Sequence, residues 1–259
     1  MVDTDTRAGA GRWVRQFGPA PDAAHRLVCF PYAGGSASYF FRLTKALAPE
    51  IDAVAVQYPG RQERRAEPII EDIGDLADRV TEAVLPWIDR PVSFFGHSMG
   101  AAVAFEVAVR LQQTGVTLTE LFVSGRRGPG TFRDERTHLA SDRELLADVR
   151  RLGGTDTAAL DDPEIAAMVL PVIRGDYRAI ERYRRAGGPV LRCGITAFTG
   201  DADPKATVEE VAEWGAHTEG AFTLREFAGG HFFLNQHADA VAGALRARLT
   251  GAESVADVR

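Results

Sequence analysis

Short hydrophobic runs alternate with longer amphipathic segments along most of the chain. Six runs rich in Val, Phe and Ile have the length and composition of buried strands. They cover residues 26–30, 53–57, 92–95, 121–124, 194–199 and 222–227. Segments at 39–47, 73–88 and 101–113 carry helical spacing between them. This alternation predicts a doubly wound α/β protein with a mostly parallel sheet covered on both faces.

Residues 126–188 interrupt this alternation, because they contain no strand-like run. Ser141 and Glu144 form a capping box that predicts a helix through Leu152, and Asp162-Pro163 is typical of the start of another helix. We therefore expect one domain over 1–259 with a helical insertion at about 126–188. Glycine pairs at 153–154 and 187–188 suit the joints of a moving lid. A helical subdomain that stays packed fits the pattern equally well.

Composition narrows the classes of function. The chain has 259 residues, 45% of them hydrophobic and 25% charged, as in an ordinary globular protein. A formal charge of −6 disfavours a nucleic-acid binder. No apolar run approaches the roughly 18 residues that span a bilayer, and Met1–Gly11 lacks signal-peptide features, so we expect a cytoplasmic protein. Cys29 and Cys193 lie in apolar runs, which predicts buried free thiols rather than a disulfide.

The segment Gly96–Gly100 reads Gly-His-Ser-Met-Gly and carries the strongest chemical signal. It follows the strand-like run 92–95 and precedes the helical segment 101–113, which is the context of a nucleophile elbow. In such a turn the serine hydroxyl is presented to substrate beside a helix N-terminus. The pattern predicts that Ser98 is a catalytic nucleophile.

A serine nucleophile needs a base, which in this fold follows the serine and the acid along the chain. Among the histidines after Ser98, His231 fits best, because it comes just after the strand-like run 222–227 and two glycines. His138 falls in the insertion and His217 near a helix end. His237 has the features of a solvent-facing or capping residue and stays as the alternative base.

The acid is expected in the loop after the strand-like run 194–199, where Asp201 and Asp203 compete. Asp203 is preferred, because Asp201 lies next to the strand end and can hold the turn by a side-chain hydrogen bond. Thr207 and Glu210 form a second capping box on the far side of this loop.

An oxyanion hole requires a backbone N–H from Met99, the residue after the serine, and another from an early loop. The segment Phe30–Ser36 reads Phe-Pro-Tyr-Ala-Gly-Gly-Ser, and its Ala33 is the expected second donor, with Tyr32 as the alternative. A glycine-rich connection without a chemical role is the competing interpretation. The sequence shows no zinc-spaced His-Cys cluster, Walker loop or dinucleotide fingerprint, so we expect neither cofactor nor metal.

Six motifs together resemble the type II, or external, thioesterases that accompany polyketide synthases and nonribosomal peptide synthetases. They occur in order along most of the chain: Phe30–Ala37, Tyr58–Arg61, Gly96–Gly100, Ser124–Arg127, Leu170–Tyr177 and Gly229–Leu234. The one noted departure is Gly175, where a small residue such as Ala is expected in a helix that glycine would loosen.

The resemblance implies an α/β-hydrolase fold with Ser98 as nucleophile, His231 as base and Asp203 as acid. It also places the oxyanion hole at the Ala33 and Met99 amides. The implied substrates are acyl thioesters on the phosphopantetheine arm of acyl or peptidyl carrier proteins, and the implied role is editing of stalled or mis-primed synthase modules. No separate cofactor, nucleic acid or membrane is implied. We expect a free-standing protein, with a monomer favoured.

Two rival functions remain open at this point. Another serine esterase, acyltransferase or cyclising release enzyme would have the same fold and triad, because neither fixes the acyl acceptor. A non-catalytic binding protein on the same fold would usually lack one member of the triad. Residues 126–192 contain 13 arginines against 11 acidic residues in a chain of net charge −6. This relatively basic segment is a hypothetical steering surface for an acidic carrier protein.

Overall fold

The computed structural model describes residues 11–154, 159–185 and 187–251. The expectation for Met1–Gly11 falls outside these ranges except at Gly11. Seven strands form one sheet in the order β1-β3-β2-β4-β5-β6-β7. Every neighbouring pair is parallel except β1 and β3, which are antiparallel. The strands are β1 (Val14–Gln16), β2 (His25–Phe30), β3 (Ile51–Val56), β4 (Val92–His97), β5 (Glu120–Ser124), β6 (Gly194–Gly200) and β7 (Phe222–Phe227).

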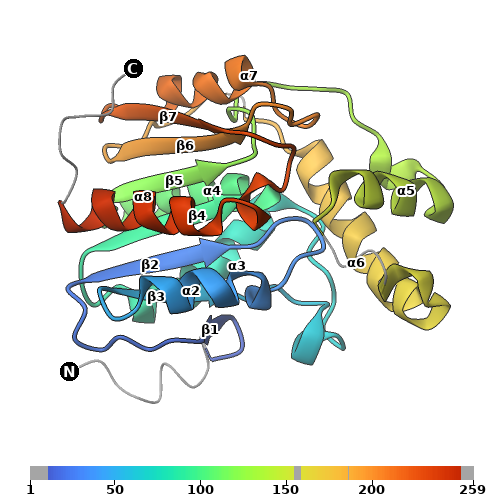
Figure 1. The fold of residues 1–259 in the computed structure, drawn as a ribbon, viewed down its shortest axis with the longest axis horizontal. Helices are drawn as coiled ribbons and strands as arrows, with labels where there is room; N and C mark the ends of the chain where they lie inside the picture. The colour runs from blue at the N-terminus through green and yellow to red at the C-terminus, as the bar shows by residue number, and fades with distance from the viewer. Residues whose placement is uncertain (1–10, 155–158, 186, 252–259) are drawn as a thin grey trace.

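Helices cover both faces of the sheet (Figure 1). Alternate residues of each strand point to opposite faces. Val28 and Phe30 therefore join a core under α3 (Ile73–Val84) and α4 (Met99–Gln113), whereas Leu27 and Cys29 join a second core under α2 (Phe41–Leu47) and α8 (Ala238–Thr250). Both cysteines are buried and free, as predicted. The predicted class, a doubly wound and mostly parallel sheet, is confirmed.

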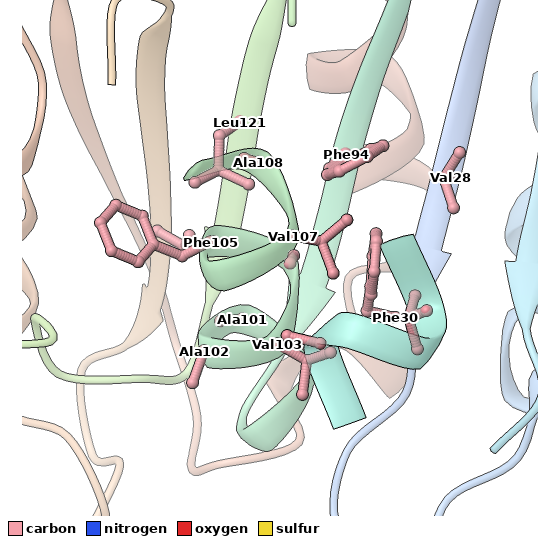
Figure 2. Packing of buried hydrophobic residues seen from close by; sticks show 14 of the residues in the cluster. Val28, Phe30, Phe94, Ala101, Ala102, Val103, Phe105, Val107, Ala108 and Leu121 are labelled. Carbon is pink, nitrogen blue, oxygen red and sulfur yellow. The ribbon is translucent and has the colours of Figure 1, made fainter. Parts of the chain in front are cut away.

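Helix α4 is central to the first core. Its small buried side chains, including Ala101 and Ala108, let the helix approach the sheet closely. Figure 2 shows α4 residues packed among Phe30 of β2 and Phe94 of β4. This close packing fixes the N-terminus of α4 against the carboxyl ends of β2 and β4.

The connection between β5 and β6 carries the helices α5 (Asp142–Leu152) and α6 (Pro163–Arg182). Ser141 forms the predicted capping box with Glu144, and Asp162 caps α6. Together the two helices lie beyond the carboxyl ends of the strands (Figure 1). They share a small apolar core that includes Leu145, Leu170 and Ile173.

Some element boundaries differ from the sequence prediction. The helix expected over 73–88 ends at Val84 and continues as a short 3₁₀ turn, because Pro86 cannot donate the next helical hydrogen bond. The helix expected over 39–47 begins with the 3₁₀ turn Ala37–Phe40, a common helix start. Strand β1 was not predicted. None of the described helices is long and apolar enough to span a bilayer.

Candidate active site

Ser98 occupies a strained turn between β4 and α4. Its φ of 54° and ψ of −118° are unusual for a residue with a side chain, and its N–H donates to the Ser124 carbonyl at 2.7 Å. The flanking glycines allow this turn. A Cβ on Gly96 would lie 2.3 Å from the Gly100 oxygen, and a Cβ on Gly100 would lie 2.0 Å from the Phe30 oxygen. The turn therefore has the geometry expected of a nucleophile elbow.

Three of the predicted side chains form one line of hydrogen-bond contacts. Ser98 Oγ lies 2.9 Å from His231 Nε2, and His231 Nδ1 lies 2.8 Å from Asp203 Oδ2 and 3.0 Å from Oδ1. The side chains of His231 and Asp203 are only 4% and 0% exposed. A buried carboxylate facing Nδ1 favours the tautomer that leaves Nε2 free to accept a proton from the serine.

The structure separates the two competing aspartates. Asp203 faces His231, and its Oδ1 also accepts the Lys205 N–H at 2.8 Å. Asp201 is exposed, and its Oδ1 accepts the Gly229 N–H at 2.8 Å. Asp201 thus ties the end of β6 to the glycine pair that precedes His231, a turn-holding contact of the kind considered for it.

The remaining candidate histidines lie away from Ser98 in other contacts. His138 is buried, with Nδ1 2.5 Å from Glu181 Oε2. His217 packs against the rings of Phe105 and Trp214. His237 Nε2 bonds the Ala228 carbonyl at 2.8 Å.

The loop after β2 brings Ala33 to the same pocket as Ser98 and His231. Met99 is the first residue of α4, so its N–H has no acceptor within the helix. Both predicted oxyanion donors therefore lie on segments that meet at Ser98.

A buried ion pair fixes the loop that carries Ala33. Gly34 N–H donates to Asp176 Oδ2 at 2.7 Å, and Arg61 makes two contacts with the Asp176 carboxylate at 2.7 and 2.9 Å. Arg61 also donates to the Gly35 carbonyl at 3.1 Å. The side chains of Arg61 and Asp176 are 7% and 2% exposed. This contact joins α6 to the loops after β2 and β3.

Sequence reasoning singled out neither member of this pair. Both lie in motifs that carried the family resemblance, but no local spacing indicates that residues 115 positions apart form an ion pair. Gly175, beside Asp176, also has a structural reason. A Cβ there would lie 2.8 Å from Ile69 Cγ2, so glycine lets α6 approach the segment that follows the Arg61 loop.

His97 is a second neighbour that the sequence did not single out. Its ring is fully buried, its Nδ1 lies 3.0 Å from Ser124 Oγ, and its centroid lies 5.2 Å from that of His231. Burial, and next the proximity of His231, hold the pKa of His97 well below its ordinary value. His97 is therefore uncharged at neutral pH and packs beside the His231 ring.

Comparison with known proteins places this site in a family. The thioesterase domain family model matches residues 25–249. A probable cadicidin biosynthesis thioesterase of Streptomyces griseus is 53% identical over 90% of this chain and 64% of its own length. Thioesterase PikA5 of Streptomyces venezuelae is 51% identical over 91% of this chain and 84% of its own length.

The chain belongs to the thioesterase family. The solved structure of the type II thioesterase BorB from the borrelidin biosynthetic cluster is 49% identical, with a TM-score of 0.86, and the match covers 92% of this chain and 97% of that one. The predicted resemblance to type II thioesterases and the predicted α/β-hydrolase fold are thereby confirmed.

Helices α5 and α6 supply much of the pocket wall in this thioesterase. Apolar parts of the wall come from Val149 and Leu152 of α5 and from Tyr177 and Ile180 of α6. Tyr32 OH donates to the Gly154 carbonyl at 2.9 Å, which joins the end of α5 to the loop after β2. Within the described ranges, no group of three or more His, Cys, Asp or Glu side chains has the arrangement of a metal site.

Proposed function

We propose that this chain hydrolyses acyl thioesters carried on the phosphopantetheine arm of acyl or peptidyl carrier proteins, with Ser98, His231 and Asp203 as its catalytic triad. The observation that carries the proposal is the continuous contact from Ser98 Oγ through His231 to the buried Asp203 carboxylate. Membership of the thioesterase family supports the thioester as the bond that is cleaved.

In the first half-reaction, His231 Nε2 accepts the Ser98 hydroxyl proton while Oγ attacks the thioester carbonyl. The Ala33 and Met99 amides donate hydrogen bonds to the oxyanion that forms. When the tetrahedral intermediate collapses, the carbon–sulfur bond breaks and the thiolate receives the proton from His231. The products are a free phosphopantetheine thiol and an acyl ester on Ser98.

In the second half-reaction, His231 takes a proton from water as that water attacks the acyl ester. Collapse of the second tetrahedral intermediate breaks the bond to Oγ and returns the proton to Ser98, releasing a carboxylic acid. Asp203 keeps the imidazole oriented and stabilises its charged form in both halves. These steps use only side chains, backbone amides and water.

The proposed biological role is editing, the removal of acyl groups from stalled or mis-primed carrier proteins. The relatives' printed names support a biosynthetic setting, because they refer to cadicidin biosynthesis and to the borrelidin biosynthetic cluster.

The structure reduces the charge available for electrostatic steering of a carrier. Seven arginines of the segment 126–192 are candidates for this role. Four of them lie in ion pairs: Arg127, Arg174, Arg178 and Arg185. Arg126 lines the active-site pocket, whereas Arg182 and Arg184 are exposed. We therefore expect kcat/KM for a carrier protein to fall less with rising salt than it would if all seven arginines were unpaired.

The rate of hydrolysis of an acylated carrier protein tests the proposal. We expect a higher kcat/KM for an acylated carrier protein than for the same acyl group on N-acetylcysteamine, with the free acid as product. Ser98→Ala is the control, and it should abolish both reactions. Equal efficiency on the two substrates would indicate a general thioesterase, and an ester or macrocycle as the main product would indicate an acyltransferase or cyclising enzyme.

A further inference from the structure

Four charged side chains line the pocket that holds Ser98 and His231: Arg126, Glu135, Lys205 and Glu181. Three of them have partners within the protein. Glu135 pairs with Arg127 at 2.5 Å, and Lys205 pairs with Asp148 at 3.2 Å. Glu181 accepts contacts from the His138 ring and from the backbone amides of residues 137 and 138.

Arg126 differs from these three. Among the described residues, no hydrogen bond or ion pair involves its guanidinium group. Its backbone is nevertheless held firmly, because the Trp214 indole N–H donates to the Arg126 carbonyl at 2.7 Å. The side chain is partly covered and borders the pocket. The adjacent Arg127 pairs with Glu135, whereas Glu135 and Glu210 act on the Arg126 guanidinium only through longer-range charge interactions. Arg126 is thus the pocket cation without a direct partner among the described residues.

The Arg126 backbone lies close to the imidazole of His231, and its side chain lines the same pocket. It follows Gly125, which has a φ of 57° just after the end of β5. A Cβ built on Gly125 would lie 3.4 Å from His231 Cε1. Arg126 therefore directly follows a residue whose backbone lies beside the imidazole that faces Ser98.

An unpaired guanidinium in such a place carries an energetic cost. Removing an arginine from water without a carboxylate or carbonyl partner is unfavourable, because the charge loses solvation that nothing replaces. Burial, and next the charge of Arg127, lower the pKa of Arg126 to about 9, so the group stays charged at neutral pH. A bound acyl group with an oxygen near this cation would offset the cost.

We infer that Arg126 binds a hydrogen-bond-accepting oxygen of the acyl group, so that the pocket favours oxygenated acyl chains over hydrocarbon chains. The guanidinium presents several N–H donors, which suit a carbonyl, a hydroxyl or a carboxylate oxygen. This inference rests on the proposed thioesterase function and adds the substrate class to it.

Matched N-acetylcysteamine thioesters test this inference. Butyryl offers no oxygen beyond the thioester, acetoacetyl adds a neutral carbonyl at the same chain length, and succinyl adds a carboxylate. We expect Arg126→Met to lower kcat/KM for at least one oxygenated substrate by about 10- to 100-fold, as for loss of a charged hydrogen bond. Butyryl should fall by a much smaller factor. The oxygenated substrate with the larger fall identifies a neutral or an anionic oxygen as the ligand.

Two control variants keep the outcome clear. Arg126→Lys retains the charge and should retain part of the preference, which guards against a folding defect in Arg126→Met. Arg79→Met removes a charge from an exposed arginine that pairs with Glu82, and it should change none of the three rates. Equal losses on all three substrates, or no loss on either oxygenated substrate, would overturn the assignment of Arg126. Failure of the wild-type protein to hydrolyse any thioester would instead contradict the proposed function itself.

Discussion

At the scale of single residues, the two aspartates after β6 make the sharpest contrast. Asp203 contacts His231 with both oxygens, whereas Asp201 contacts the Gly229 amide. We predict that Asp203→Asn lowers kcat about 10⁴-fold, because an amide at this place favours the wrong imidazole tautomer. Asp201→Asn retains an acceptor for Gly229 and should lower kcat far less. Steady-state kinetics measure kcat for the two variants. A larger loss of kcat in Asp201→Asn than in Asp203→Asn would reassign the acid to Asp201.

The glycines of the elbow allow a test of backbone packing. Gly100→Ala would place a Cβ 2.0 Å from the Phe30 oxygen, so the free energy of unfolding should fall by about 3 kcal/mol or more. Gly243, inside α8, has no atom within 4 Å of a built Cβ. Gly243→Ala should therefore raise the free energy of unfolding by about 0.5–1 kcal/mol. Denaturant unfolding measures the change in the free energy of unfolding for each variant. Similar changes for the two variants would refute this account of the elbow.

The sequence pointed to the three side chains at Ser98 but not to the ion pair behind them, and the difference has a physical reason. Ser98, His231 and Asp203 each follow a strand that its hydrophobic run identifies, and the carboxyl ends of parallel strands meet at one edge of the sheet. The structure brings these three side chains together, and their catalytic roles remain a prediction. Asp176 and Gly34 meet across 142 positions, and no local pattern indicates such a contact.

At the scale of elements, the ion pair between Arg61 and Asp176 joins α6 to the loop after β2 that carries Ala33. Asp176→Ala would leave the buried Arg61 without its carboxylate partner and would remove the acceptor for Gly34 N–H. We predict a loss of about 3–5 kcal/mol in the free energy of unfolding. We also predict a fall in kcat with little change in KM, because the loop amide acts mainly on the transition state.

A control for this element is Asp142, whose side chain is 70% exposed and pairs with Arg174. Asp142→Ala should cost less than about 1 kcal/mol, as is usual for an exposed pair. Denaturant unfolding curves and separate values of kcat and KM are measured for Asp176→Ala and Asp142→Ala and compared. If Asp176→Ala raised KM alone, the ion pair would shape substrate binding rather than position the loop.

Strands and helices were predicted to different extents. The buried strands were found because parallel strands covered on both faces read as continuous apolar runs. Strand β1 has three residues at the sheet edge, too few for a pattern. Helix α8, which packs on the second core, was also not identified. Its alanines and Gly243 give only a weak contrast between its two faces.

At the scale of the whole molecule, buried and half-buried histidines should make stability depend on pH. Desolvation lowers the pKa values of His25 and His217, and it lowers that of His97 most clearly. Below their ordinary value of about 6.5, the unfolded chain binds protons that these folded groups do not. Stability contributed by these histidines is therefore present above that pH and is lost as the pH falls below it.

His25 allows this contribution to be isolated. It is buried, and its Nε2 lies 3.0 Å from Ser93 Oγ, a contact that glutamine can also make. We predict that the free energy of unfolding of the wild type falls from pH 7 to pH 5.5, and that His25→Gln falls less steeply. The difference can reach about 1.4 kcal/mol per pH unit for one proton. Denaturant titrations across this range measure it, and equal slopes for the two proteins would contradict the prediction.

The central claim is that Ser98 is the nucleophile that carries the acyl group, and its most direct test is covalent labelling. A serine-directed fluorophosphonate should add one adduct to the wild-type protein, which peptide mass spectrometry should locate on Ser98, with parallel loss of thioester hydrolysis. Ser98→Ala should take no adduct and should show no turnover while remaining folded. An adduct on another residue, or near-normal turnover by folded Ser98→Ala, would contradict the account.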